Sequence, residues 1–202
     1  MKTKKQQSLK NASFQWRKKR FHDPYKVITE VFDYANLGFY RKFIGDVLLY
    51  SSLKKQYTKL HPGNMLFLLE GFSCLLQACS VIGKEQKHSI LDFREKDLLN
   101  RKFYSFHTTD TECWADFPRS LSVAETNNPY AVFKNVFQCK SPEEWMDAFK
   151  DLVEDACGSY ADVSDENTLD MYMQLTKVLE AAHLIYIREI VYIRNWRIPQ
   201  QV

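Results

Sequence analysis

Two pairs of side chains in this sequence have the types and spacing that chemistry on a substrate would need. Arg101 and His107 lie six residues apart in the stretch Arg-Lys-Phe-Tyr-Ser-Phe-His. A histidine at this spacing could give or take a proton at a scissile phosphate, while the arginine stabilises the charge that develops there. Glu180 and His183 lie three residues apart, so a helix would place the carboxylate and the imidazole on one face, as a metal site requires.

The first pair is similar to the Arg-x(4–6)-His motif of the all-helical HEPN-type ribonucleases. This resemblance implies RNA cleavage, with His107 as the acid or base and Arg101 as the charge clamp. An exposed arginine and a structural histidine often have the same spacing without a common role. Arg101 and His107 are therefore the sequence's only catalytic candidates, and a HEPN-like ribonuclease is the weakest of three functional interpretations.

The second pair has the Glu-x-x-His spacing of di-iron four-helix bundles. A dinuclear site needs two such pairs and two further carboxylates, whereas the equivalent earlier positions hold Gln77 and Ser80. No other histidine or cysteine spacing resembles a zinc site, and no glycine-rich phosphate loop occurs. We expect no metal and no cofactor, and we lean towards a protein that is not an enzyme.

A ten-residue pattern occurs twice in the chain. Residues 23–32 and 128–137 both begin with Asp or Asn followed by Pro-Tyr, and both continue with apolar residues at the same spacing. Asp23 or Asn128 as the capping residue, with proline at the first helical position, predicts a helix start in each place. A longer helix and a third helix follow each copy in the same order. Asn64 is the expected cap of the third helix, and the last helix is expected to run from about 165 to 196.

These elements predict an all-α protein: a helical bundle built from two tandem three-helix repeats with approximate two-fold pseudo-symmetry. Repeat one is expected at about 23–83, a linker at 84–127, and repeat two at about 128–196. Together they form a single helical domain at 21–202, preceded by a basic arm at 1–20. Convergent helix patterning is the alternative to duplication.

Composition agrees with a folded helical protein. The chain has 202 residues, 45% of them hydrophobic, and only six glycines and six prolines. Its five cysteines show no regular spacing, and no secretory signal is visible, so we expect a reducing, cytoplasmic setting. The apolar run from Met65 to Ile82 contains Glu70 and Gln77, and we interpret it as a core helix, with no transmembrane segment.

Charge is distributed unevenly. The first 20 residues hold eight cations and no acid, so the remainder carries 20 basic and 25 acidic residues. This arm has three interpretations: nucleic-acid binding, approach to an acidic membrane or protein partner, or a solvated tail. The residues for nucleic-acid or acidic-partner binding are Lys2, Lys4, Lys5, Lys10, Trp16, Arg17, Lys18, Lys19 and Arg20.

A second binding surface is expected near the end of the chain. Arg188, Tyr192 and Trp196 are spaced four residues apart, so one face of the last helix would be basic and aromatic. The sequence thus favours a non-enzymatic intracellular interaction or scaffold module that binds a protein partner or self-associates. The alternative is a nucleic-acid-associated protein that docks through the arm. The sequence determines neither the partner nor the oligomeric state.

Overall fold

The computed structural model describes residues 23–53, 55–85, 100–105, 114–158, 167–193 and 196–198, with residues 167, 191–193 and 196–198 described by their backbone alone. Within these ranges seven α-helices carry the core, which confirms the all-α fold class. They are α2 (Pro24–Tyr34), α3 (Leu37–Ser51), α4 (Pro62–Lys84), α6 (Val123–Asn127), α7 (Pro129–Cys139), α8 (Pro142–Cys157) and α9 (Asn167–Glu189).

Both Pro-Tyr sequences begin helices, as predicted, but only one is capped as expected. The Asp23 carboxylate accepts hydrogen bonds from the backbone N–H groups of Tyr25 and Lys26. Asn128 does not cap α7 through its side chain. The reason is that Asn128 also ends α6, where its own N–H donates to the carbonyl of Ala124, and its backbone is held in an irregular conformation.

The second helix of each set starts with a polar cap. Asn36 accepts from the N–H of Phe39 and starts α3, so the break between α2 and α3 lies at Ala35–Asn36 and Gly38 belongs to the helix. Ser141 and Glu144 form the capping box of α8. Gly158 ends α8 by donating its N–H to the carbonyls of Glu154 and Asp155.

The third helix, α4, begins two residues before the predicted cap. His61 is the N-cap, and its Nδ1 accepts from the N–H of Gly63 because Pro62 already has helical geometry. Among the described residues, α4 is the one helix long and apolar enough to cross a membrane by length and composition. However, 67% of its most apolar stretch is buried inside the protein, as a core helix requires.

The last helix is shorter than predicted. α9 ends at Glu189, and two short strands follow, β1 (Val191–Ile193) and β2 (Trp196–Ile198), which pair antiparallel with Tyr192 opposite Arg197. Residues 190–193 are Ile-Val-Tyr-Ile, and such β-branched and aromatic residues favour extended backbone over helix. Periodicity alone did not reveal this change.

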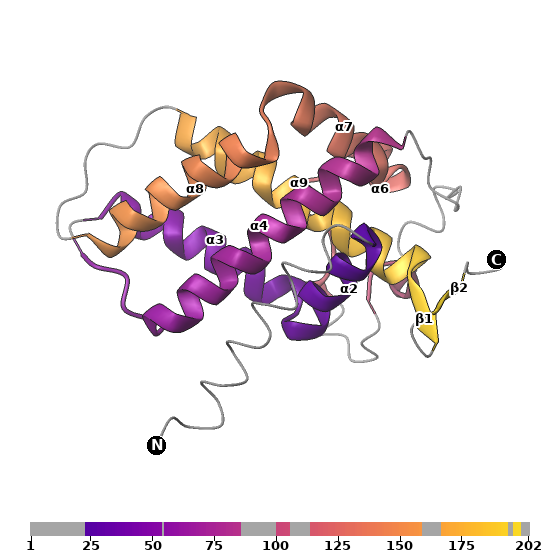
Figure 1. The fold of residues 1–202 in the computed structure, drawn as a ribbon, viewed down its shortest axis with the longest axis horizontal. Helices are drawn as coiled ribbons and strands as arrows, with labels where there is room; N and C mark the ends of the chain where they lie inside the picture. Colours follow the sequence, from indigo (N-terminus) through magenta and orange to yellow (C-terminus); the bar gives the residue numbers. More distant parts are fainter. Residues whose placement is uncertain are drawn as a thin grey trace, which may run out of the picture.

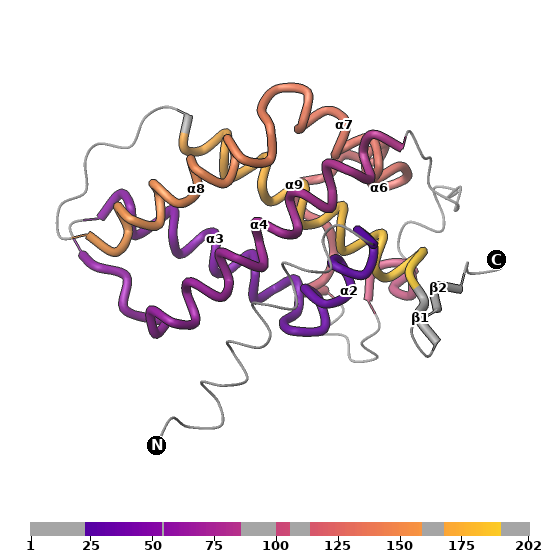
Figure 2. Tube along the Cα trace, in the orientation of Figure 1, coloured from indigo at the N-terminus to yellow at the C-terminus, as the bar shows by residue number. Residues whose placement is uncertain are grey.

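The helices pack around α9. α2 lies against α4 and α9, α7 lies against α9 and α4, and α3 packs on α8 and α9. In Figure 1, α4 (magenta) passes in front of α9 (yellow), with α3 and α8 at one end of the molecule and the β1–β2 hairpin at the other. Figure 2 shows α2 beside the C-terminal half of α9, where Tyr186 donates to Asp33.

The core contains apolar residues that lie at helical spacing in the sequence. Val31, Phe43 and Leu179 are all buried, and Leu75 and Leu76 of α4 are fully enclosed. The described parts of the linker between the helical sets lie against this core. They include η2 (Arg101–Phe103), a single 3-10 turn that contacts α9, and α6.

Candidate functional site

A buried ion pair between Arg41 and Glu180 joins α3 to α9. The Arg41 Nε and Nη2 atoms both donate to the Glu180 Oε1 atom, at 2.9 and 2.6 Å. The side chain of Arg41 is 9% exposed and that of Glu180 is fully buried. Because an unpaired charge in such a place is costly, the two residues depend on each other.

The same pair holds the linker against the bundle. Arg41 donates to the carbonyls of Ala115 at 2.6 Å and Phe117 at 2.7 Å. The Glu180 carboxylate accepts from the backbone N–H groups of Arg119 at 3.0 Å and Ser120 at 2.8 Å. Residues 115–120 are therefore attached to both helices through side-chain-to-backbone bonds, and the hydrogen-bonding capacity of Glu180 is largely used.

A pocket of about 290 Å³ opens beside this pair. We call it the ion-pair pocket, and besides Arg41 and Glu180 its walls include Lys42, Arg119, Ser120, Tyr172 and Thr176. Burial lowers the pKa of Arg41, and the charge of Glu180 partly offsets that effect. The Thr176 Oγ1 atom is buried and has no hydrogen-bond partner within the described ranges.

A second buried polar cluster lies at the C-terminal end of α9. Arg188 donates to the carbonyls of Phe103 and Thr126, and its guanidinium lies 5.2 Å from the centre of the Tyr104 ring. Burial lowers the pKa of Arg188 to about 10, so the group remains charged at neutral pH. These contacts attach the η2 turn and the end of α6 to α9.

The neighbouring residue, Glu189, accepts a hydrogen bond of 2.5 Å from the hydroxyl of Tyr130. Both side chains are buried, and burial together with this bond raises the pKa of Tyr130 well above its ordinary value. The bond connects the start of α7 to the end of α9. Like the Arg41–Glu180 pair, it serves packing within the protein.

The structure describes only Arg101 of the predicted catalytic pair Arg101 and His107. Arg101 is exposed on the η2 turn, close to the Phe103 carbonyl that Arg188 binds. His107 lies outside the described residues, so the distance between the two side chains is not defined and the pair stays a prediction.

The Glu-x-x-His pair does not act as a unit. Glu180 binds Arg41, whereas His183 is buried with its ring edge-on to Phe32, the ring centres 4.9 Å apart. Within the described ranges no group of three or more His, Cys, Asp or Glu residues is arranged to hold a metal ion.

The basic and aromatic helical face that was predicted from the spacing of Arg188, Tyr192 and Trp196 does not form. α9 ends at Glu189, so Tyr192 and Trp196 belong to β1 and β2, and Arg188 is directed inward to the linker. The arm residues Lys2, Lys4, Lys5, Lys10, Trp16, Arg17, Lys18, Lys19 and Arg20 lie outside the described residues.

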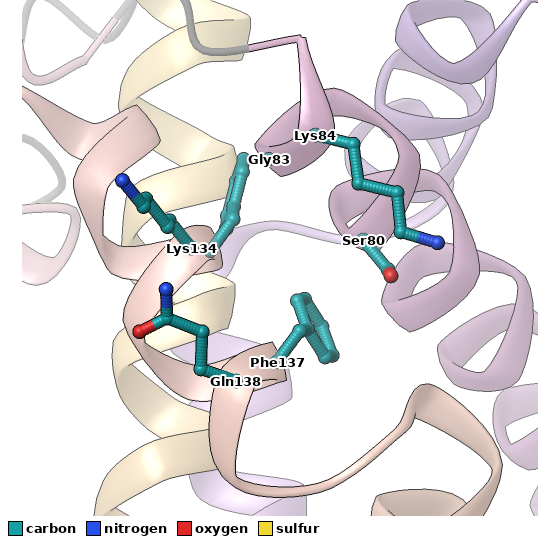
Figure 3. Close-up of a pocket in the computed structure, with 7 residues that line it drawn as sticks. Ser80, Gly83, Lys84, Lys134, Phe137 and Gln138 are labelled. Carbon is teal, nitrogen blue, oxygen red and sulfur yellow. The ribbon is translucent and has the colours of Figure 1, made fainter.

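A second pocket, of about 320 Å³, lies between α4 and α7. Its walls include Ser80, Lys84, Lys134, Phe137 and Gln138. Figure 3 shows the Lys84 and Lys134 side chains pointing in opposite directions, with the Phe137 ring lower in the view. The lysine ammonium groups therefore do not converge on one point.

Sequence reasoning missed the Arg41–Glu180 pair, because its members are 139 residues apart. Arg41 alone looks like an ordinary surface charge, and Glu180 is singled out by the sequence only together with His183. Sequence reasoning also missed the Ser122–Glu125 capping box, whose Ser-x-x-Glu spacing is a recognisable signal for α6. Comparisons of this chain with family models, with curated proteins and with solved structures give no match.

Proposed function

We propose that this chain is a non-enzymatic helical interaction module built from two copies of one helical triplet, α2–α3–α4 and α7–α8–α9. The observation that carries the functional part is a set of four exposed apolar side chains at or just after the C-terminal end of α3 and in the first two turns of α9. We call it the α3–α9 patch: Leu49, Leu53, Leu169 and Met173, which are 53%, 41%, 64% and 39% exposed.

The four side chains follow from how the two helices pair. Arg41 on α3 meets Glu180 on α9, and one turn further along α3 and two turns back along α9 a β-carbon on Gly45 would lie 3.9 Å from the Tyr172 ring. The helices are therefore antiparallel, so the end of α3 that carries Leu49 and the start of α9 that carries Leu169 lie at the same end of the pair. Single exposed apolar residues are common, but a group on adjacent turns of two helices is typical of an interaction surface.

The occupant that we propose is a second copy of this chain. A two-fold axis running between the antiparallel α3 and α9 would place Leu49 of one copy opposite the partner's Leu169, and the reverse. Such an interface is self-complementary, because each copy offers the same two stripes.

The use of the buried polar groups also favours a binding role. Arg41, Glu180, Arg188 and Glu189 are charged residues inside the protein, and they form hydrogen bonds with the linker, with each other or with Tyr130. These hydrogen bonds hold the linker and the helix ends in place.

The duplication is supported by the spacing of the elements. Pro24, Leu37 and Pro62 begin the first three helices, while Pro129, Pro142 and Asn167 begin the last three. Each start thus lies 105 residues after its counterpart. Helix lengths agree as well, since α2 and α7 each have 11 residues and α4 and α9 each have 23.

Matched hydrogen bonds lie at the same register. The Tyr25 hydroxyl donates to Glu85 just after α4, as that of Tyr130 donates to Glu189 at the end of α9. Tyr40 donates to the carbonyl of Val31, and Trp145 donates to that of Val136 in the same way. Both donor pairs and the Val31–Val136 pair keep the offset of 105, and Glu189 lies 104 residues after Glu85. Bonds at so nearly constant an offset are difficult to explain by convergent patterning. At this register Tyr40 is the counterpart of Trp145.

Sedimentation velocity tests the patch. Wild-type protein should form a dimer whose population increases with concentration, and the double variant Leu49→Gln/Leu169→Gln should stay monomeric. The matched control is Leu66→Gln/Val123→Gln, which changes side chains of similar exposure, 67% and 62%, on α4 and α6. A wild type that is monomeric at every concentration would refute the proposal, as would a patch variant that dimerises normally.

A second proposal concerns the basic arm, supported by its eight cations without an acid ahead of a body that carries a net negative charge. We propose that residues 2–20 bind nucleic acid through phosphate contacts.

A further inference from the structure

We propose that the ion-pair pocket binds a small molecule through an oxyanion, a phosphate or carboxylate group. This inference does not depend on the α3–α9 patch and goes beyond the binding role proposed above. Its first basis is charge. Three cations, Arg41, Lys42 and Arg119, line the pocket together with a single carboxylate, Glu180.

The Glu180 carboxylate does not oppose an incoming anion strongly, because its charge is already compensated. It accepts from the Arg41 guanidinium and from two backbone N–H groups. The charges of Arg41 and Glu180 cancel each other, so the positive charges of Lys42 and Arg119 remain at the pocket wall. Asp116, which lies close enough to affect the pKa of Arg41, is buried outside the wall and accepts from the Ser105 hydroxyl.

Lys42 is available for a ligand. Its only carboxylate neighbour in the described ranges is Asp46, at 3.9 Å, and Asp46 is bound more closely by Lys59, at 2.9 Å. Arg119 is exposed, and its contact with Glu180 is made by the backbone N–H, so the guanidinium is not used by that bond. A bidentate guanidinium and a flexible ammonium are the side chains that proteins use to hold phosphate and carboxylate groups.

The second basis is an unsatisfied hydroxyl. Thr176 is 3% exposed and lines the pocket, and its Oγ1 atom has no hydrogen-bond partner within the described ranges. A buried hydroxyl in this state carries a desolvation cost that a ligand oxygen would remove. Ser120 and Tyr172 bring two further hydroxyl groups to the same wall.

Size and position narrow the class of ligand. At about 290 Å³ the pocket is at the lower end of the range for small-molecule sites, so the ligand is small. Because the wall is formed by α3, α9 and residues 115–120, a bound oxyanion would add a further link between the linker and the two helices.

Isothermal titration of the full chain tests the site, with inorganic phosphate and acetate as separate probes and ionic strength held constant with chloride. We expect saturable binding of at least one probe with one site per chain, and the stronger probe identifies the anionic group. The double variant Lys42→Gln/Arg119→Gln should bind that probe at least tenfold more weakly, since it removes both uncompensated cations.

The matched control is Lys84→Gln/Lys134→Gln, which removes two cations from the pocket between α4 and α7 and should bind like the wild type. Thr176→Val keeps the shape of the side chain, so it should unfold no more easily than wild type while binding the probe more weakly. The proposal is refuted if folded wild-type protein binds neither probe. Equal loss of binding in the two double variants would also refute it, because it would indicate only general charge attraction.

Discussion

Gly83 on α4 lies so close to Phe133 on α7 that a β-carbon at position 83 would be 2.9 Å from the Phe133 β-carbon. The backbone nitrogen of Lys134 would be only 3.2 Å away. Because the obstacle includes backbone, α4 and α7 would have to move apart. Gly83→Ala should therefore lower the free energy of unfolding by about 1–3 kcal/mol, although alanine is the better helix former.

Gly45→Ala is the matched control for that substitution. Its added β-carbon would meet the Tyr172 ring at 3.9 Å, an ordinary contact, so helix propensity should dominate and stabilise the protein by about 0.5–1 kcal/mol. Urea unfolding of the two variants measures both effects. Changes of the same sign in both would contradict the close approach of α4 and α7.

The Arg41–Glu180 pair should be sensitive to the loss of either member alone. Arg41→Met or Glu180→Leu leaves the other charge buried, and each should cost about 3–5 kcal/mol of unfolding free energy. The double variant should cost much less than the sum of the singles. Urea unfolding of the wild type, the two single variants and the double variant measures this double-mutant cycle. Additive losses of unfolding free energy would mean that the two charges do not depend on each other.

The two matched tyrosines should differ in their contribution to stability. Tyr130→Phe removes a 2.5 Å bond to the buried Glu189 carboxylate and should cost about 1–3 kcal/mol. Tyr25→Phe removes a 3.3 Å bond to Glu85, which is exposed, together with an interaction with the Tyr130 hydroxyl, and should cost less than Tyr130→Phe because it leaves the buried carboxylate of Glu189 with its partner. Thermal or urea unfolding compares them, and a larger loss from Tyr25→Phe would reverse the expected order.

The elements of this fold that could be predicted from sequence are those with local signals. Proline at the first helical position marks α2, α7 and α8, and apolar residues at helical spacing mark the buried faces that contain Val31 and Phe43. These signals depend on residues within one or two turns of each other, so a single sequence is sufficient to read them.

The candidate site could not be predicted in the same way. Arg41 lies on a helix with solvent-exposed charged neighbours such as Lys42, and only the packing of α3 against α9 brings Arg41 to Glu180. Helical spacing similarly predicted that Arg188 lies on an exposed face of the last helix, whereas in the structure its side chain binds the Phe103 carbonyl at the η2 turn. Helical spacing assigns a residue to a face, but not the segment that covers that face.

Acid should remove part of the stability that α6 gains from α9. Lys177 donates to Glu125 at 2.7 Å. Burial alone would raise the pKa of Glu125, but the hydrogen bonds from Lys177 and Ser122 outweigh it and hold the pKa below the ordinary value of 4.5. A lowered folded-state pKa means that this stabilisation is complete above pH 4.5 and is lost as the pH falls through the lower folded value.

Glu125→Gln isolates that charge, because glutamine can still form the capping box with Ser122. At pH 7 the variant should be less stable than wild type by about 0.5–1 kcal/mol, and the difference should disappear towards pH 3. Lys177→Met removes the partner and should give the same pH dependence. A stability difference that is the same at pH 7 and pH 3 would contradict the assignment.

Deletion of residues 1–20 should separate binding by the arm from folding of the body. The helices from α2 onward form the core, so the deletion should hardly change the melting temperature. If the eight cations of the arm contact phosphates, binding to single-stranded RNA or DNA should fall on the order of a thousandfold or more between 50 and 200 mM salt.

A variant with all eight cations replaced by glutamine keeps the length of the arm and should lose binding as the deletion does. Fluorescence anisotropy with labelled oligonucleotides at several salt concentrations measures this. Full-length protein that binds neither nucleic acid at low salt, or a deletion that binds as tightly as wild type, would exclude the arm as a nucleic-acid-binding element.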